Sequence, residues 1–426
     1  MRDFLPADKA RRERVLAVIR DRYRAHGFDE IETPVMEDYD RLHAGMGGDN
    51  EKLAFNVLKR ALSPEAIAAA ADDPAALSDL GLRFDLTVPL ARFYASHRAE
   101  LPGVFRSVQI APVWRAERPQ KGRYRQFVQC DIDIIGDAGA RAEAELIVAT
   151  LDTLDALGLV GASVRINDRR ALAWILNVLG VPDDAHAATL ITLDKLDKKG
   201  RSGVVEELYD NGLSVDSVER INEYLAALLT DSDGIEHASA AIPVSEEAII
   251  RALPVADDRP PIDRILEIRE AVSAAVGLDE VPLVFDPFLV RGMGYYTGTI
   301  FELAHPSVPY SLGGGGRYDG MIGRFLGQDV PAVGFSIGFE RIVDLVSAGE
   351  DAGLDAVVLV HDRDVPVAEL VAVKSALVTA GSRVRLEQRT KNLKALLERA
   401  AADGYTAFAT VAAGDDPSEL ELKPLA

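Results

Sequence analysis

Hydrophobic and polar residues alternate along this chain with two different periods, which divide it into helical and extended segments. Residues 8–26 carry apolar side chains at helical spacing and are followed by Gly27, so they predict a helix. Residues 29–34 form a short extended run that ends at a proline. Between 104 and 136, apolar and polar residues alternate with many β-branched side chains. This stretch predicts two antiparallel strands joined by a loop at 117–123, and an amphipathic helix at 140–157 follows.

The period changes again further along the chain, and the changes predict its domains. Helical periods dominate from 168 to 276, whereas 281–285 and 299–303 return to strand-like composition. Between 356 and 412 three strands alternate with two helices, which is typical of a small layered α/β domain. We therefore expect an α+β protein in four parts. They are a core segment at 1–167, a helical insertion at 168–276, a second core segment at 277–348, and an α/β domain at 353–426 that is either compact or truncated.

Composition narrows the class of protein. The 426 residues are 48% hydrophobic and 27% charged, which is ordinary for a globular chain. The sequence contains no run of about 18 apolar residues, so we expect no membrane span. The first residues lack the basic and then apolar pattern of a signal peptide, so none is expected. The single cysteine, Cys130, excludes a disulfide within the chain and a cysteine-based metal site. These features predict a reducing, cytoplasmic setting.

The net charge of −21 opposes binding to a nucleic acid, because phosphate contacts need lysine and arginine. The charge is unevenly distributed, however. Between 105 and 126 only Glu117 is acidic, and six residues are basic: Arg106, Arg115, Arg118, Lys121, Arg123 and Arg125. Such a cluster is either an ordinary solvated face or a local surface for a polyanion.

The sequence contains no P-loop, zinc-protease or nucleophile-elbow signature. Its seven histidines are scattered, so neither a metal site nor a catalytic triad is encoded locally. Arg115 stands where the first strand of the predicted hairpin meets the basic loop. Because a guanidinium group matches the geometry of phosphate oxygens, Arg115 is a candidate phosphate ligand. The alternative is a simple hairpin with a charged tip.

Two further segments combine polar and aromatic residues. Gln129, Asp131 and Asp133 share one face of a strand, where they either bind a small polar ligand or face solvent. Arg291 follows an apolar strand and precedes glycines and the pair Tyr295–Tyr296. That pattern predicts either a pocket for a charged substrate with a flat group, or a glycine-bent hairpin whose tyrosines pack in the core.

Two glycine-rich segments complete the set of candidates. Four consecutive glycines at 313–316 either expose backbone amides to a ligand or form a flexible hairpin tip. Residues 333–342 predict a strand of small residues that leads into a helix with Arg341 near its start. A buried strand packed against another backbone is the alternative for this last segment.

Taken together and in this order, these segments resemble the class II aminoacyl-tRNA synthetases, and among them the histidyl-tRNA synthetases. Residues 32–34 resemble motif 1, and 115–127 resemble motif 2. Residues 289–299 and 314–320 are similar to two histidine-specific signatures, and 334–341 to motif 3. The resemblance covers nearly the whole chain. It implies an antiparallel sheet flanked by helices, a helical insertion and a C-terminal anticodon-binding α/β domain.

The resemblance also implies roles for single residues in binding ATP. Arg115 would contact the α-phosphate and Arg341 the far phosphates, with Gly314 and Gly315 lining the ATP site. Arg291 would be a second catalytic cation beside the α-phosphate.

Other residues match positions that bind the amino acid or the tRNA. Asp85 and Thr87 would hold the amino-acid end of histidine. Four others would contact the bound histidine or line its side-chain pocket: Gln129, Asp133, Tyr295 and Tyr296. The acceptor end of the tRNA would be guided by Arg118, Lys121 and Arg123.

The implied reaction joins L-histidine and ATP into histidyl-adenylate and pyrophosphate, and then transfers histidine to the 3′ end of tRNA(His). Mg²⁺ is expected with the ATP phosphates. Motif 1 lies at the dimer interface in this family, so the resemblance implies a homodimer. One position departs from the pattern: family members usually carry aspartate where this chain has Gly294. This changes the hydrogen bonding behind the pocket but removes no phosphate ligand.

Two other functions fit parts of the pattern. A catalytically inactive, synthetase-like regulatory subunit of ATP phosphoribosyltransferase shares the core, but such chains generally lack the anticodon domain and need not keep the arginines. A class II synthetase for another amino acid, such as proline or threonine, is disfavoured by the combination of Arg291 with Tyr295 and Tyr296.

Overall fold

The computed structural model describes residues 2–43, 53–118, 124–230, 242–277, 281–290, 295–346, 356–415 and 420–425. The chain divides into two compact units. The larger consists of Met1–Arg2 and Val15–Val346, and the smaller of Asp3–Arg14 and Ser347–Ala426. Within the described ranges no helix has the length and apolar character needed to cross a bilayer.

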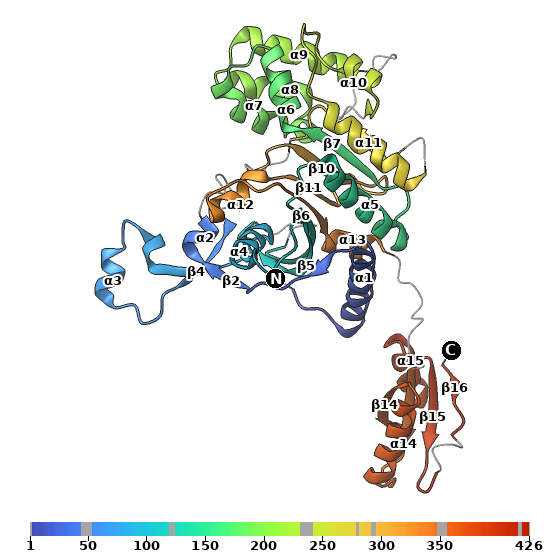
Figure 1. Ribbon diagram of the computed structural model, residues 1–426. Coiled ribbons are helices and arrows are strands. Elements are labelled where there is room, and N and C mark those ends of the chain that lie inside the picture. The colour runs from blue at the N-terminus through green and yellow to red at the C-terminus, as the bar shows by residue number, and fades with distance from the viewer. Residues whose placement is uncertain are drawn as a thin grey trace. The chain divides into compact units, whose positions relative to one another are not determined.

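The larger unit is built on a nine-stranded sheet with the strand order β1-β5-β6-β12-β11-β10-β7-β9-β8 (Figure 1). The strands are β1 (Asp29–Glu30), β5 (Phe105–Trp114), β6 (Gln126–Ile135), β7 (Ser163–Asp168), β8 (Ile242–Pro243), β9 (Leu283–Phe285), β10 (Thr299–Ala304), β11 (Gly313–Arg317) and β12 (Ala332–Gly338). Neighbouring strands are antiparallel except for the parallel pairs β1–β5 and β7–β9. The antiparallel core that the resemblance implies is confirmed, with a parallel pair towards each edge.

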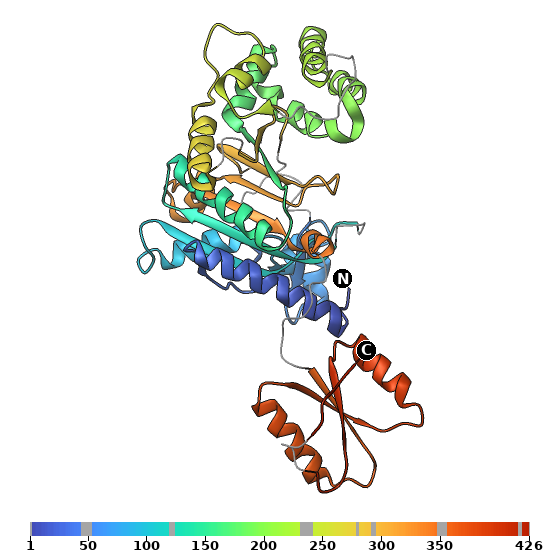
Figure 2. The same ribbon diagram turned by 90° about the vertical axis from the view of Figure 1, so that its right-hand side faces the viewer.

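The predicted hairpin at 104–136 is confirmed as β5 and β6, which pair from Phe105↔Ile135 to Trp114↔Gln126. Because successive residues of a strand face opposite sides, Cys130 and Ile132 face a hydrophobic core while their neighbours face the other way. Three helices cover this core face (Figure 2). They are α1 (Pro6–Ala25), α5 (Ala140–Ala156) and α11 (Asp263–Val276), the last of which packs on α5.

Shorter helices complete the larger unit. Those whose apolar residues join a second core are α2 (Tyr39–His43), α4 (Thr87–His97) and α12 (Asp319–Leu326). Helix α13 (Phe339–Leu345) packs its apolar residues into the core of α1 and α5. There is also a short helix α3 (Pro64–Ala69), with a 3₁₀ turn at Pro74–Leu77. A three-stranded sheet with the order β2-β4-β3 consists of β2 (Met36–Asp38), β3 (Phe55–Leu58) and β4 (Ser78–Leu82). Apolar side chains of α4 and α12 pack together with Tyr295 and Tyr318 in the second core. This second core lies on the face of the sheet opposite α1, α5 and α11.

A bundle of helices follows β7, and Figure 1 shows it on the side of the sheet where β7 lies. Its members are α6 (Arg169–Val178), α7 (His186–Leu193), α8 (Leu196–Asp210), α9 (Val215–Leu229) and α10 (Glu246–Ala252), with a 3₁₀ turn at Asp183–Ala185. The helical periods of the sequence are thus confirmed here. The short strand β8 within this stretch has no counterpart in the sequence pattern.

The smaller unit has a four-stranded sheet with the order β14-β13-β15-β16. Its elements are β13 (Ala356–His361), α14 (Val367–Thr379), β14 (Arg383–Gln388), α15 (Leu393–Ala402), β15 (Ala407–Val411) and β16 (Lys423–Pro424). Val357 and Leu359 of the central strand pack with α14, whereas Val358 and Val360 pack with α15. The order of elements predicted up to residue 412 is confirmed, and the sheet is covered on both faces.

Candidate active site

The face of the large sheet opposite α1, α5 and α11 is polar. Directly paired residues of neighbouring strands project to the same side, so the strand register places one row of residues across this face. From β5 to β7 the row reads Gln109, Asp131, Ser336, Gly314, Glu302 and Arg165. The adjoining row contains Asp133, Gly334 and Gly316. Carboxylates, hydroxyls and bare backbone therefore make up the floor of the candidate site.

The four glycines at 313–316 are neither a hairpin tip nor a set of exposed amides. They form most of β11, which is paired on both sides, with β10 and with β12. An added Cβ at Gly313 would lie 2.4 Å from the Ser336 carbonyl oxygen, and one at Gly316 would lie 2.6 Å from that of Thr299. The strand is therefore restricted to glycine by its neighbours, and its missing side chains leave a trough in the floor.

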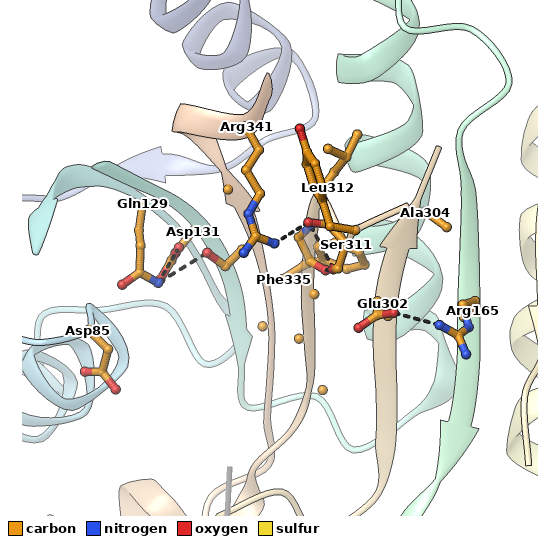
Figure 3. Close-up of a pocket in the computed structure, with 18 of the residues that line it drawn as sticks. Asp85, Gln129, Asp131, Arg165, Glu302, Ala304, Ser311, Leu312, Phe335 and Arg341 are labelled. Atoms are coloured by element: carbon orange, nitrogen blue, oxygen red, sulfur yellow. Dashed lines mark hydrogen bonds and ion pairs between the residues drawn. The ribbon is translucent and has the colours of Figure 1, made fainter. Parts of the chain in front are cut away.

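Above this floor lies a cavity of about 780 Å³. Its walls come from the segment before α4, the hairpin β5–β6, the tyrosines at 295–296, strands β10 to β12 and the start of α13. Figure 3 shows Asp85, Gln129 and Asp131 on one side of Arg341, and the Glu302–Arg165 pair on the other. The cavity thus has a strongly acidic end.

The acidic end contains Asp85, Asp131 and Asp133, each at most 5% exposed. Burial raises the pKa of Asp85 to about 6, although its Oδ1 accepts a hydrogen bond from the Val88 backbone N–H. Burial raises the pKa of Asp133 to about 7, an effect that the Tyr318 hydroxyl at 2.5 Å partly offsets. Burial and the nearby charge of Asp133 also raise the pKa of Asp131. Three carboxyl groups share one small space and favour a cationic ligand.

Two buried acceptor atoms beside these carboxyl groups have no hydrogen-bond partner among the described residues: Oδ2 of Asp85 and Oε1 of Gln129. Both residues line the cavity. A buried polar atom without a partner costs free energy unless a ligand or water satisfies it. The acidic end is therefore suited to a ligand group that donates hydrogen bonds and carries positive charge.

Two arginines contribute positive charge to the same cavity. Arg115 follows β5, its Nε donates to the Phe84 carbonyl oxygen at 2.9 Å, and its guanidinium lies 5.0 Å from the centre of the Phe127 ring. Arg341, in the first turn of α13, donates to the Ser311 carbonyl oxygen and lies 5.5 Å from the centre of the Tyr310 ring. Backbone contacts hold both guanidinium groups at the cavity wall, where they can bind an anion.

Aromatic side chains complete the acidic end. The rings of Tyr295 and Tyr296 have centroids 4.9 Å apart, and Tyr318 meets Tyr295 edge-on at 6.0 Å. Tyr318 is 2% exposed and donates its hydroxyl hydrogen to Asp133. Gly334 leaves the space that this carboxyl group occupies, because an added Cβ there would lie 2.0 Å from Oδ1 of Asp133.

A buried ion network supports the strand that precedes Tyr318. Arg317 donates from Nε and Nη2 to the two carboxylate oxygens of Glu143 in α5, at 2.8 and 2.7 Å. Thr299 and Arg264 also donate to Glu143. Burial alone would raise the pKa of Glu143, but the hydrogen bonds and charges of Arg317 and Arg264 outweigh it and lower this pKa. The network ties β10, β11, α5 and α11 together behind the pocket.

A second ion cluster lies at the opposite wall of the cavity. Arg165 in β7 pairs with Asp286, with Glu302 at 2.9 Å and with Asp197 of α8 at 3.5 Å. Since Asp197 lies in the first turn of α8, a helix of the bundle, Arg165 links the bundle to the floor of the site.

The structure gathers most of the residues that the sequence singles out into this one cavity. Its walls include Asp85, Thr87, Arg115, Gln129, Asp133, Tyr295, Tyr296, Gly314, Gly315 and Arg341. Arg118 is exposed and does not line the cavity. Four others, Arg291, Gly294, Lys121 and Arg123, lie outside the described residues.

Asp131, which shares the period-two face of Gln129 and Asp133, also lines the cavity, as one of the two interpretations of that face predicts. The sequence missed three other residues of the site. Tyr318 directly follows the glycine strand and Arg317. Arg165 and Glu302 carry no local signal, because they meet only through the pairing of β7 with β10.

Comparisons with known proteins show which family the chain is similar to. A sequence model described as histidyl-tRNA synthetase matches residues 1–342. The chain is 58% identical over 429 aligned residues to a histidine–tRNA ligase from Leifsonia xyli subsp. xyli, covering 100% of this chain and 97% of that protein. It is 41% identical to a probable histidine–tRNA ligase from Tropheryma whipplei, with 100% and 98% covered.

Solved structures show the same fold. A histidyl-tRNA synthetase from Nostoc sp. PCC 7120 aligns with a TM-score of 0.72 and 24% identity, covering 100% of this chain and 93% of that chain. A Bacillus halodurans protein described as an ATP phosphoribosyltransferase regulatory subunit/histidyl-tRNA synthetase aligns with a TM-score of 0.71 and 22% identity, covering 93% and 94%. Such low identities speak for the fold alone. The family match over 342 residues and the full-length relatives establish that this chain belongs to the histidyl-tRNA synthetase family.

Proposed function

We propose that the chain is a histidine–tRNA ligase. It activates L-histidine with ATP, and it then transfers histidine to the 3′ end of tRNA(His). The observation that carries this proposal is a single cavity with two chemically different parts. Three buried carboxyl groups stand at one end, and the guanidinium groups of Arg115 and Arg341 stand on the wall. An amino acid and a nucleoside triphosphate need this combination of charges.

The acidic end is the proposed site for histidine. Oδ2 of Asp85 and Oε1 of Gln129 are buried acceptors that would take hydrogen bonds from the ammonium group, and Thr87 lies beside them. Asp133 would accept a hydrogen bond from an imidazole N–H, with Tyr295 and Tyr296 as the walls around the ring. Imidazole is a planar ring with an N–H donor at its edge. Its faces can pack against the tyrosine rings while the N–H donates to the carboxylate.

The arginines are the proposed partners of the ATP phosphates. A carboxylate oxygen of histidine attacks the α-phosphorus, a new O–P bond forms, and the bond to the β-phosphate breaks to release pyrophosphate. Arg115 would stabilise charge on the α-phosphate and Arg341 would hold the far phosphates, above the β11 backbone at Gly314 and Gly315, which lines the cavity. Since arginine stays protonated, both act electrostatically and not as bases.

A second step would complete aminoacylation. A ribose hydroxyl of the terminal tRNA adenosine attacks the carbonyl carbon of the adenylate, and AMP leaves. Arg118, Lys121 and Arg123 are proposed to guide the acceptor end, and the α/β domain at 353–426 to bind the anticodon. The role of Arg291 as a second cation at the α-phosphate rests on the sequence resemblance.

Mg²⁺ belongs to the substrate in this proposal, because it accompanies the ATP phosphates. Among the described residues no three histidine, cysteine or acidic side chains are grouped to hold a metal ion. Glu302 and Glu340 line the cavity but are paired with Arg165 and Arg2, at 2.9 and 2.8 Å. The homodimer, the cytoplasmic location and the boundaries 1–167, 168–276, 277–348 and 353–426 are further parts of the same proposal.

The test is ATP–pyrophosphate exchange with each of the twenty amino acids. Exchange that depends on histidine alone is the expected result. Well-folded protein without any exchange would contradict the enzyme proposal and favour the regulatory subunit of ATP phosphoribosyltransferase instead. Exchange with proline or threonine in place of histidine would assign the chain to another specificity.

A further inference from the structure

The side-chain amide of Gln129 is held in one orientation. Its Nε2 donates to both carboxylate oxygens of Asp131, at 3.2 and 3.4 Å, and to the Ser336 hydroxyl at 3.3 Å. Its Oε1 is buried and has no partner among the described residues. Figure 3 shows the amide nitrogen facing Asp131 with the oxygen on the far side of the group.

An amide group can present either its oxygen or its nitrogen in almost the same space, so its surroundings decide which one faces a ligand. The Ser336 hydroxyl does not fix the orientation of the Gln129 amide, because a hydroxyl group can both donate and accept a hydrogen bond. An ionised carboxylate only accepts, so rotating the amide would place Oε1 against the oxygens of ionised Asp131. It would also turn the N–H groups of Gln129 towards the ligand. Burial raises the pKa of Asp131, whereas the positive charge of a bound ammonium group would favour its ionised form. Asp131 is therefore the group that determines the orientation.

We infer that Asp131 is a positioning residue for recognition of the substrate ammonium group, because it holds the Gln129 amide with its oxygen towards the cavity. This inference rests on the proposed binding of histidine at the acidic end. Asp131 also lines the cavity, and both of its oxygens accept from the Gln129 amide nitrogen. It acts on the ligand through Gln129.

The first experiment measures histidine affinity and exchange kinetics for Asp131→Ala and Asp131→Asn. Removing the carboxylate frees the Gln129 amide to rotate. In the molecules whose amide has rotated, the hydrogen bond from the substrate ammonium group to Oε1 is lost. The histidine KM of Asp131→Ala should rise about tenfold, with kcat and the ATP KM within about twofold. Asp131→Asn should be intermediate, since its own amide can still offer an oxygen to Gln129. Asp155→Asn, on the exposed side of α5, is the matched control for loss of one carboxylate.

The second experiment uses a ligand without the ammonium group. Imidazolepropionate keeps the ring and the carboxylate of histidine, so its affinity should be nearly the same for the unaltered chain and for Asp131→Ala. Equal weakening of histidine and imidazolepropionate would overturn the inference, because it would mean that the whole pocket is disturbed.

A double-mutant cycle separates positioning from direct contact. In a Gln129→Ala background, Asp131→Ala should change the histidine KM by less than about twofold. Additive effects would show that Asp131 acts on the ligand independently, which contradicts the inference. Failure of the proposed function would look different, because the unaltered chain would then neither bind histidine nor support histidine-dependent exchange.

Discussion

The rings of Phe301 in β10 and Phe335 in β12 stack on each other across the strand that lies between them. Their centroids are 5.6 Å apart and their planes differ by 11°. Both residues are Cα partners of Gly315 in β11. Two strands separated by a third are about 9.5 Å apart, so the rings meet only because position 315 has no side chain. The glycine strand thus shapes the core behind the sheet as well as the cavity in front.

Gly315→Ala should destabilise the fold. Its Cβ would lie 1.9 Å from the Gly334 carbonyl oxygen, a backbone atom that cannot move without disturbing the ladder. Overpacking of this kind costs about 1–3 kcal/mol or more in the free energy of unfolding, and denaturant titration would measure it. Gly103→Ala is the control, because nothing lies within 4 Å of its added Cβ. Equal stability of the two variants would contradict the close packing described for β11.

Gly334→Ala should impair histidine binding more than stability. Its Cβ would meet Oδ1 of Asp133, the end of a side chain that can turn aside. Turning aside breaks the hydrogen bond with Tyr318 and withdraws the carboxyl group from the pocket. We expect the histidine KM to rise about tenfold or more, while the ATP KM changes little. A variant with unaltered histidine KM would remove Asp133 from the proposed site.

Glu143→Ala should be among the more destabilising single changes. It leaves the guanidinium of Arg317, 3% exposed, without its carboxylate partner. Breaking a buried pair from one side costs about 3–5 kcal/mol, and the denaturation midpoint should fall accordingly. The exposed pair Glu247–Arg251 offers a control, because Glu247→Ala should cost well under about 1 kcal/mol. If both variants lose the same stability, the buried network has no special role.

Without substrate, stability should fall as the pH rises from about 4 to about 7. The folded-state pKa of Asp85 is raised to about 6 and that of Asp133 to about 7, so in this range the folded chain keeps protons that the unfolded chain has lost. Stability therefore decreases with pH, by about 1.4 kcal/mol for each pH unit over which the two states differ by one proton. Asp133→Asn should show a shallower decrease than the unaltered chain in denaturant titrations at several pH values. Parallel pH profiles would contradict the raised pKa of Asp133.

Replacing Arg115 and replacing Arg341 should affect different kinetic parameters of the exchange reaction. Arg115→Ala removes a charge proposed to act on the α-phosphate in the transition state, so kcat of exchange should fall by about 10²–10³. Arg341→Ala should mainly raise the ATP KM, because it is proposed to hold the far phosphates in the ground state as well. Steady-state exchange kinetics distinguish these outcomes, with the exposed Arg251→Ala as control. Identical effects of both changes would contradict the separate roles.

The sequence predicted the parts of the fold that have a strong period. The hairpin β5–β6, helices α1 and α5, and the order of elements from β13 to β15 follow from alternation and helical spacing. Strand β11 could not be predicted, because four glycines have no side chains from which a period can be recognised. Short strands such as β8 and β16 hold two residues each and also lack a pattern.

The candidate site was predictable where neighbouring residues share a segment. Gln129 and Asp133 share a strand, and Tyr295 and Tyr296 are adjacent. The contacts that complete the site join distant segments: Glu143 and Arg317 are 174 residues apart, and Arg165 and Glu302 are 137 apart. Only the pairing of strands brings such groups together, so no local pattern in the sequence indicates them.

The trough of β11 limits how this protein can change its substrates. Its contour is set by peptide groups that hydrogen bonds fix on both sides, and peptide groups have no rotamers to change. An added Cβ at Gly316, on the cavity side, would meet the Thr299 carbonyl oxygen and the Tyr296 ring, so a larger residue there disturbs the sheet before it can alter what the cavity accommodates. New specificity, whether by natural drift or by design, is therefore more accessible through the side chains around the trough than through Gly316.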